Sequence, residues 1–176
     1  GDDIVIGGVN SDTLLAGAGN NIVLGDNGYI DWAARERGGL LAGDDLSPAT
    51  IDRIVSLDPS HGGNDTITTL GGDDIVVGGG DGELVVASDL VGTGPAPLHT
   101  VTDPHPAGDW ILAGEGRNLV LGDSGEIYAS AVDGPHFGHL ALTPGYVGSI
   151  AFTTGGADHV ETGAGDDIVI GGVNSD

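Results

Sequence analysis

Aspartate and asparagine recur at a fixed spacing in this chain, each just after a cluster of glycines. Read in frames of nine, the sequence gives GGVNSDTLL (7–15), AGAGNNIVL (16–24), TLGGDDIVV (69–77) and TGAGDDIVI (162–170). Glycine clusters at positions one to four, Asp or Asn stands at position six, and an aliphatic residue stands at position eight. Glycine permits positive-φ turns and leaves backbone carbonyls open to a ligand. Since a carboxylate supplies the hard oxygen that Ca²⁺ requires, the frame predicts turns that can bind calcium.

The aliphatic residues of each frame predict the strands that hold these turns. Segments such as IVI (4–6) and LVL (119–121) predict strands of about three residues whose central side chain points inward. Two frames then make one coil of a flattened spiral, and successive coils pair at a spacing of roughly 4.8 Å. A single coil cannot bury its aliphatic row alone, so the coils must stack.

These frames resemble the RTX, or haemolysin-type calcium-binding, nonapeptide repeat GGxGxDxUx. The resemblance implies an all-β fold: a right-handed parallel β-roll, or β-solenoid, of nonapeptide coils, interrupted here by β-hairpin excursions and loops. It also implies that Ca²⁺ lies in the turns, is bound by the position-six side chain and by turn carbonyls, and orders the roll. Carried over by position, the matching carboxylates are Asp3, Asp12, Asp65, Asp74, Asp109, Asp158, Asp167 and Asp176. The neutral amides of Asn21 and Asn118 occupy the same slot, and Glu83 places a longer side chain there.

Each of these positions also has a simpler interpretation. An Asp in a glycine-rich turn can serve only to cap its own backbone, so ligand and turn former remain alternatives at any single position. Without cations, stacked carboxylates would repel one another at a coil spacing of roughly 5 Å. For the whole series, the alternative is a Gly/Asp-rich solenoid held together by aliphatic stacking alone.

The chain repeats at two levels. The segment GDDIVIGGVNSD occupies residues 1–12 and recurs at 165–176, which indicates a 164-residue period within a longer array. The period is itself a duplication, because AGAGNNIVLGDNG and AGEGRNLVLGDSG are the same unit 97 residues apart. The predicted first half is 1–61, with frames over 1–33 and then a β-rich excursion. The predicted second half is 62–154, with frames over 60–86 and 104–130, an inserted loop at 87–103 and an excursion over 126–152. Residues 155–176 are the start of the next period.

Two further segments lie where each series of frames ends. NIVLGDNGYIDW (21–32) and LVLGDSGEIYA (119–129) each predict a strand, a tight turn and a second strand, which is a hairpin pattern. Asp26 and Asp123 stand at these corners and could either bind an ion or cap the turn. LSPATIDRIVS (46–56) and LTPGYVGSIAF (142–152) predict strands, although Ser47 and Pro48 could instead begin a short helix.

The composition bounds the partners. There are 27 acidic and 4 basic side chains, and the formal net charge is −23. This balance argues against nucleic acid and anionic membranes as partners and favours cations. With no cysteine, the chain has neither a disulfide framework nor a thiolate metal site. No apolar run approaches 18 residues, so we expect no membrane insertion.

No catalytic constellation emerges, and we expect no enzyme. GDSG (122–125) resembles the nucleophile region of trypsin-like proteases, but Ser124 aligns with Asn27 of GDNG in the internal repeat, which indicates a turn position filled by a small polar residue. His136 and His139 are spaced i, i+3, and they are either a transition-metal pair or, more simply, two solvated loop residues.

The pattern and the resemblance together favour a calcium-binding structural repeat module of a giant secreted protein. Such modules would join end to end with copies of themselves into an extracellular fibre, sheath or adhesin stalk, and lateral pairing of chains is left open. The alternative is a calcium-triggered folding and secretion module of an RTX enzyme or toxin whose active domain lies elsewhere. The resemblance implies a bacterial extracellular or cell-surface location reached by type I secretion.

Overall fold

The computed structural model describes residues 1–32, 47, 49–80, 108–132, 134–150, 152–153, 155–174 and 176. Within these residues every regular element is a β-strand, so the predicted all-β class is confirmed. The same part of the chain contains no helix that is long and apolar enough to cross a membrane. Glu83 and the insertion predicted at 87–103 lie outside the described residues.

The strands form three sheets. Sheet A is parallel, in the order β1 (Ile4–Ile6), β3 (Ile22–Leu24), β7 (Ile75–Gly79), β9 (Leu119–Asp123), β13 (Ile168–Ile170). Sheet B is parallel, in the order β2 (Thr13–Gly17), β6 (Thr66–Thr69), β8 (Trp110–Gly114), β12 (His159–Thr162). Sheet C is antiparallel, in the order β4 (Gly28–Asp31), β5 (Arg53–Ser56), β10 (Gly125–Ala129), β11 (Pro144–Ser149).

Successive frames alternate between sheets A and B. The chain runs from β2 to β3, from β6 to β7, from β8 to β9 and from β12 to β13, so each pair of frames supplies one strand to each sheet. Equal frame positions stack on one another: Val23 pairs with Val5 on one side and with Val76 on the other. The predicted stacking of two-frame coils therefore describes sheets A and B correctly.

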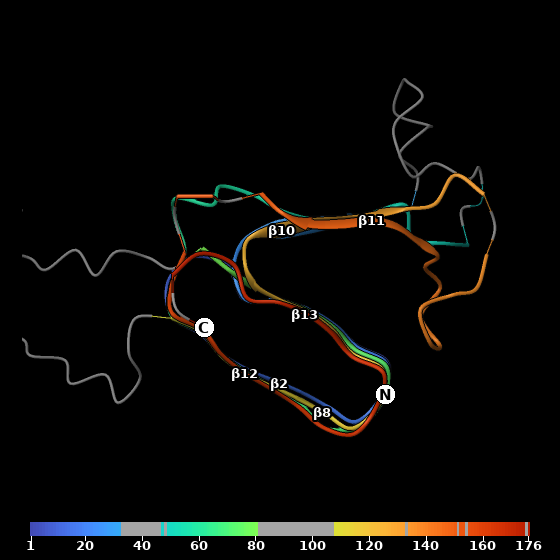
Figure 1. Ribbon diagram of the computed structural model, residues 1–176, viewed down its shortest axis with the longest axis horizontal. Coiled ribbons are helices and arrows are strands. Elements are labelled where there is room, and N and C mark those ends of the chain that lie inside the picture. The colour runs from blue at the N-terminus through green and yellow to red at the C-terminus, as the bar shows by residue number, and fades with distance from the viewer. Residues whose placement is uncertain are drawn as a thin grey trace, which may run out of the picture.

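Sheet A is the middle layer, between sheets B and C (Figure 1). The central valines of its strands, Val23, Val76 and Val120, contact Ile67 and Ile111 of sheet B in one core cluster. The flanking side chains of the same strands form a second cluster with sheet C. Side chains alternate between the two faces of a strand, so an uninterrupted apolar triplet such as Ile22–Leu24 is buried throughout only when both faces are covered.

The second cluster joins sheets A and C. Ile54 of β5 and Ile127 of β10 are both fully buried in it, and Phe137 and Leu142 from the segment between β10 and β11 complete it. The third layer explains why the flanking residues of the sheet A strands are aliphatic and not polar.

The hairpins predicted at 21–32 and 119–129 are wrong. β3 pairs with β1 and β7, whereas β4 pairs with β5; β9 and β10 likewise belong to different sheets. Both edges of β3 and β9 are occupied by neighbouring coils, so the chain cannot fold back onto them and crosses into sheet C. The strands predicted within 46–56 and 142–152 are present as β5 and β11. Ser47 forms a turn, in which its carbonyl accepts the Thr50 backbone N–H.

Candidate functional site

The position-six side chains form two columns, one at each end of the coils. The Asn/Asp column precedes the strands of sheet A and consists of Asp3, Asn21, Asp74, Asn118 and Asp167. The all-Asp column precedes the strands of sheet B, and Asp176 continues it in the following frame; it consists of Asp12, Asp65, Asp109, Asp158 and Asp176. The chain termini, one beside each column, lie at opposite ends of sheets A and B (Figure 1).

Backbone hydrogen bonds hold the all-Asp column together. Each backbone N–H donates to Oδ1 of the carboxylate one coil further on, from Asp12 to Asp65 at 2.8 Å, from Asp65 to Asp109 at 2.7 Å, from Asp109 to Asp158 at 2.9 Å and from Asp158 to Asp176 at 3.1 Å. Oδ1 of each acceptor therefore takes part in the packing of adjacent coils. These donors lie 18 to 53 residues away, so the bonds join neighbouring coils and are not the capping of an Asp's own backbone that a glycine-rich turn suggests.

The second carboxylate oxygen is not used in this way. Among the described residues, Oδ2 of Asp12, Asp65 and Asp158 is buried and accepts no hydrogen bond. A buried charged group without a partner is costly, so each unsatisfied oxygen requires a physical reason. The backbone hydrogen bonds between coils account for one oxygen of each carboxylate and leave the other without an explanation.

Glycines at the ends of the sheet A strands lie directly against these oxygens. A Cβ added to Gly25 would lie 2.2 Å from Asp65 Oδ2 and 2.2 Å from the carbonyl oxygen of Gly78. The same close approach joins Gly78 with Asp109, Gly122 with Asp158, and Gly171 with Asp176. Since only glycine fits, the absent side chain leaves a carboxylate oxygen and a carbonyl oxygen on the same side of each turn.

Burial strongly perturbs these carboxyl groups. It raises the pKa of Asp65 to about 7, an effect opposed by the Asp12 backbone N–H and reinforced by the Asp12 carboxylate. Burial likewise raises the pKa of Asp158 to about 7, and the negative charges of Asp123 and Asp176 add to the increase. Burial and neighbouring negative charge thus both disfavour the ionised forms of Asp65 and Asp158.

Asp26 and Asp123 lie at the same end of the coils as the all-Asp column. Asp123 accepts the backbone N–H groups of Gly156 at 3.1 Å and Val173 at 2.6 Å, so it caps two turns. Its pKa is raised, mainly by burial. Asp26 is also buried, and a Cβ added to Gly62 would lie 1.9 Å from its Oδ2. The donors to Asp123 belong to turns in other segments and not to its own corner, and ion binding by Asp26 and Asp123 stays a prediction.

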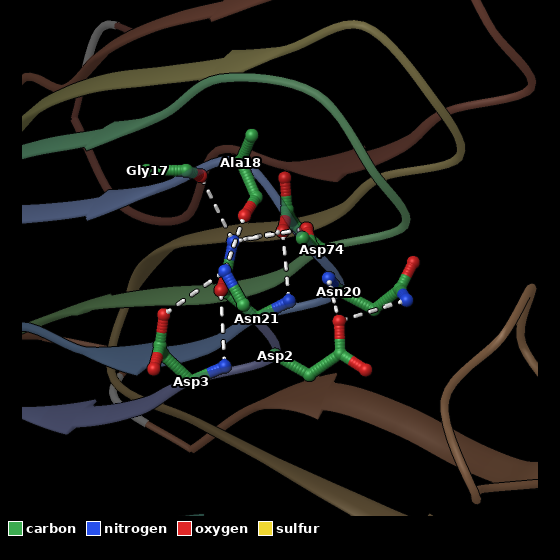
Figure 2. Close-up of polar contacts among 9 residues, drawn as sticks. Asp2, Asp3, Gly17, Ala18, Asn20, Asn21 and Asp74 are labelled. Atoms are coloured by element: carbon green, nitrogen blue, oxygen red, sulfur yellow. Dashed lines mark hydrogen bonds and ion pairs between the residues drawn. The ribbon is translucent and has the colours of Figure 1, made fainter.

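In the Asn/Asp column an amide nitrogen satisfies the turn (Figure 2). Nδ2 of Asn21 donates to the carbonyl oxygens of Gly17 at 3.1 Å and Gly19 at 3.0 Å, and to Asp74 Oδ1 at 2.9 Å. Nδ2 of Asn118 repeats the pattern two coils further on, donating to the carbonyl of Gly114 at 3.1 Å and to Asp167 Oδ1 at 3.0 Å. Two turn carbonyls and a carboxylate, which are ligands suited to a cation, are thus bound by an N–H₂ group.

The Asn/Asp column is not satisfied throughout. Within the described residues, Asp74 Oδ2 and Asn118 Oδ1 are buried and have no hydrogen bond. Burial raises the pKa of Asp74, while hydrogen bonds from Asn21 and Thr69 oppose that increase. Asp74 therefore retains one oxygen that a cation could use, in a turn that Asn21 already largely satisfies.

The position-five side chains form an outer column beside it. Asp2 Oδ1 accepts the backbone N–H of Asn20 at 2.8 Å and its Nδ2 at 3.1 Å; Asn20 Oδ1 accepts the Asp73 N–H, and Asp73 Oδ1 accepts the Arg117 N–H. Acids thus alternate with an amide and a guanidinium. This column was not predicted from the sequence, although Asp2, Asn20, Asp73 and Arg117 stand at position five of their frames.

His139 belongs to this outer column and not to a histidine pair. Its backbone N–H and Nδ1 both contact Asp73 Oδ2. Burial acts to raise the pKa of Asp73, but hydrogen bonds from Arg117 and His139 outweigh it and hold the pKa below its usual range. In the part of the chain that the structure describes, no three His, Cys, Asp or Glu side chains are gathered as a metal site.

These observations define what kind of ion the turns can hold. In the all-Asp column a carboxylate oxygen and a backbone carbonyl oxygen lie together at Gly25 and again at Gly78. Such mixed oxygen sets are the ligands of Ca²⁺. The all-Asp column offers both kinds of oxygen, and the unsatisfied Oδ2 atoms fit the ion, whereas the Asn21 and Asn118 amides reduce the need for it at the other end of the coils.

Comparison with known proteins identifies the repeat. The family model described as RTX calcium-binding nonapeptide repeat (4 copies) matches residues 1–29, 61–82 and 150–176. No curated protein and no solved structure matches the chain.

Proposed function

Because this chain carries RTX calcium-binding nonapeptide repeats, we propose that it is a structural module of a giant secreted bacterial protein. The module is a parallel β-roll that calcium orders and a third sheet covers, and its copies join end to end into an extracellular fibre, sheath or adhesin stalk. RTX repeats typically belong to secreted bacterial proteins, which supports an extracellular or cell-surface location.

The observation that carries the calcium assignment is the buried, unsatisfied Oδ2 atom of Asp12, Asp65 and Asp158. Bound calcium would supply the positive charge that these carboxylates lack. We assign the ions to the all-Asp column: Asp12, Asp65, Asp109, Asp158 and Asp176. In the Asn/Asp column, Asp3, Asp74 and Asp167 have a smaller part, because neighbouring amides already donate to the carboxylates of Asp74 and Asp167.

The repeated twelve residues support end-to-end joining. β1 pairs with β3 through Ile4 and Ile22, and β13, which has the same sequence, pairs with β9 through Ile168 and Leu119. β1 is therefore paired with the strand that follows it in the stack, and β13 is paired with the strand that precedes it. The two pairings use the same frame positions. Together they supply both sides of one continuous joint.

A structural role agrees with the absence of a catalytic arrangement in the sequence. Ser124 is 1% exposed, and its carbonyl accepts the Ile150 N–H, as suits a turn residue. Under the alternative role, a folding and secretion module of an enzyme or toxin, calcium would still fold the chain but copies would not associate.

A calcium titration followed by circular dichroism tests the assignment with two matched variants. Asp65→Asn and Asp74→Asn make the same chemical change in different columns. We expect Asp65→Asn to raise the calcium midpoint of folding about tenfold, equivalent to about 1.4 kcal/mol, and Asp74→Asn to change it by about twofold or less.

Equal shifts for the two variants would contradict the column assignment. A wild-type signal that does not respond to calcium or EDTA would overturn the calcium role itself. Electron microscopy of the same samples would show whether copies associate end to end.

A further inference from the structure

Building on the proposed end-to-end joining, we propose that sheet C also continues through the joint. Strand β11 of one copy would pair antiparallel with β4 of the following copy. The partner of this sheet edge is thus a second copy of the same chain, and the array has three continuous layers.

The strands of sheet C lie beside particular strands of sheet A, at the same height along the stack. Three residues separate β3 from β4, and Ser124 alone separates β9 from β10, so these strands start level with β3 and β9. One strand, β7, separates β3 from β9 in sheet A, and one strand, β5, separates β4 from β10 in sheet C. Sheet C therefore advances by one strand per coil, as sheets A and B do.

The repeated segment at 1–12 and 165–176 shows where a following copy would begin in the stack. β13 takes the level that β1 of a following copy would take, because both are the same twelve-residue segment. The next level then holds β3 of the following copy, with β4 beside it in sheet C. β11 lies one level beyond β10, so the edge of β11 that pairs with no strand of the described residues faces that β4 directly.

Strand direction and register agree with this pairing. Sheet C alternates in direction from β4 to β11, so another β4 beyond β11 would again be antiparallel. Its inner row runs Ile30–Ile54–Ile127–Val147, each residue opposite the next. Continuing the row places Val147 opposite Ile30 of the following copy, and Gly148 opposite Tyr29.

Burial along this row shows where a neighbour is missing. Ile54 and Ile127, in the middle, are fully buried, whereas Ile30 and Val147, at its two ends, are only partly buried against the same core cluster. An exposed edge with a half-covered apolar residue favours further pairing. Joining two copies would cover both ends with one contact.

Disulfide formation tests the pairing, since the chain has no cysteine of its own. The test protein is the full chain followed by one more period, residues 13–176. Gly148→Cys is placed in the first copy and Tyr29→Cys in the second. A Cβ at Gly148 meets only the hydroxyl end of Tyr146 closely, at 2.4 Å, and that side chain can move.

Two further cysteine pairs make the result specific. Tyr146→Cys with the same Tyr29→Cys is displaced by two residues along β11, beyond the reach of a disulfide by about 1–2 Å. The other pair reports on sheet B and consists of Glu161→Cys in the first copy and Leu15→Cys in the second. The register of β12 on β8, of β8 on β6 and of β6 on β2 places these two exposed residues opposite each other across the joint.

We expect the Gly148/Tyr29 and Glu161/Leu15 pairs to oxidise readily, and the displaced pair several-fold less. If only the Glu161/Leu15 pair forms, copies join but sheet C is interrupted, and this inference is overturned while the proposed function stands. If the displaced pair forms in preference, the register is wrong. If no pair forms in a protein that circular dichroism shows to be folded, end-to-end joining itself fails.

Discussion

Asn21 and Asp65 occupy the same frame position at opposite ends of the coils, and they differ in whether they need a bound cation. The Asn21 amide donates to two carbonyls and a carboxylate, so its turn is satisfied by the protein itself. Asp65 accepts one backbone N–H and buries its second oxygen without a partner. Folding without calcium should therefore depend on the first residue, and calcium binding on the second.

Asn21→Ala should destabilise the protein whether or not calcium is present. The change removes the amide donor from the carbonyls of Gly17 and Gly19 and from Asp74 Oδ1, at a cost of about 2–3 kcal/mol. The Leu70 N–H still donates to the Gly17 carbonyl, and the backbone N–H of residue 21 still donates to Asp74. Urea unfolding in EDTA and in calcium measures it. Asn20→Ala is the control: it removes a partly exposed amide of the outer column, which donates to Asp2 and accepts the Asp73 N–H, and it should cost about 1 kcal/mol or less. Equal losses for the two variants would contradict this role of Asn21.

The calcium-free protein should become less stable as pH rises from about 4 to about 7. Burial raises the folded pKa of Asp65 and Asp158 to about 7, whereas unfolded Asp titrates near its usual value. Between these values the unfolded chain binds fewer protons, so stability falls with pH and levels off above the folded pKa. Urea midpoints in EDTA at several pH values measure the slope.

The Asp65→Asn, Asp158→Asn double variant should show a shallower slope, which separates these two groups from the general repulsion of 27 acidic side chains. Calcium should reduce the slope in the wild type. A midpoint that rises with pH would be inconsistent with buried, uncompensated carboxylates.

At the level of turns and strands, glycine determines how closely coils can stack. Gly116 has φ +126°, and a Cβ on it would lie 1.9 Å from the carbonyl oxygen of Gly72 in the neighbouring coil. Gly17 also has a positive φ, +82°, but a Cβ there would meet nothing within 4 Å. The two glycines therefore separate backbone conformation from contact between coils.

Gly116→Ala should destabilise the protein by at least about 3 kcal/mol, since it adds a clash with a neighbouring backbone to an unfavourable φ. Gly17→Ala should cost only the conformational part, about 1 kcal/mol. Thermal or urea unfolding of both variants at one calcium concentration gives the comparison. Similar losses would mean that coil spacing does not limit this position.

The sequence predicted sheets A and B because their signal is local and repeated. Each frame carries its own glycine turn and apolar triplet, so strand, turn and stacking position follow from nine residues. Sheet C carries no such repeat. Its strands pair across long separations, Ile54 with Ile127 for example, and the pattern at Asp26–Asn27 was mistaken for a hairpin because a local turn signal does not show that both edges of β3 are occupied.

The same distinction explains the site. Every position-six residue predicted as a ligand falls in one of the two columns, which the nine-residue frame places correctly. The two columns differ in the residue that stacks on each position-six side chain one coil away. Asp74 stacks on Asn21, for example, although it lies 53 residues further along the chain, so the pairing depends on the order in which the coils stack. The alternation of Asp and Asn in every second frame was the available signal.

At the scale of the whole molecule, the strands at the two ends of the stack are less buried than the strands at its centre. Ile4 is 52% exposed in β1, Leu15 is 74% exposed in β2, and Ile168 is 46% exposed in β13, whereas the central strands β7 and β9 are buried throughout. Coils of a stacked array gain stability from their neighbours, so a terminal coil is the weakest.

A chain of two periods should therefore be more stable than one period under the same conditions. We expect an increase of at least about 1 kcal/mol, which corresponds to about 2–4 °C in the melting temperature of a domain this size. Scanning calorimetry of the two proteins at equal calcium measures it. Unchanged melting, with two independent transitions, would mean that the periods do not contact each other.

The advance of one strand per coil in every layer also relates chain length to physical length. Four coils per period, at a strand spacing of about 4.8 Å, would extend a joined array by about 19 Å for every 164 residues. An array 1,000 Å long would need about fifty periods, a single polypeptide of roughly 8,000 residues. In such a protein, gain or loss of a period in the gene would change the reach of the array in equal steps and leave its cross-section unchanged.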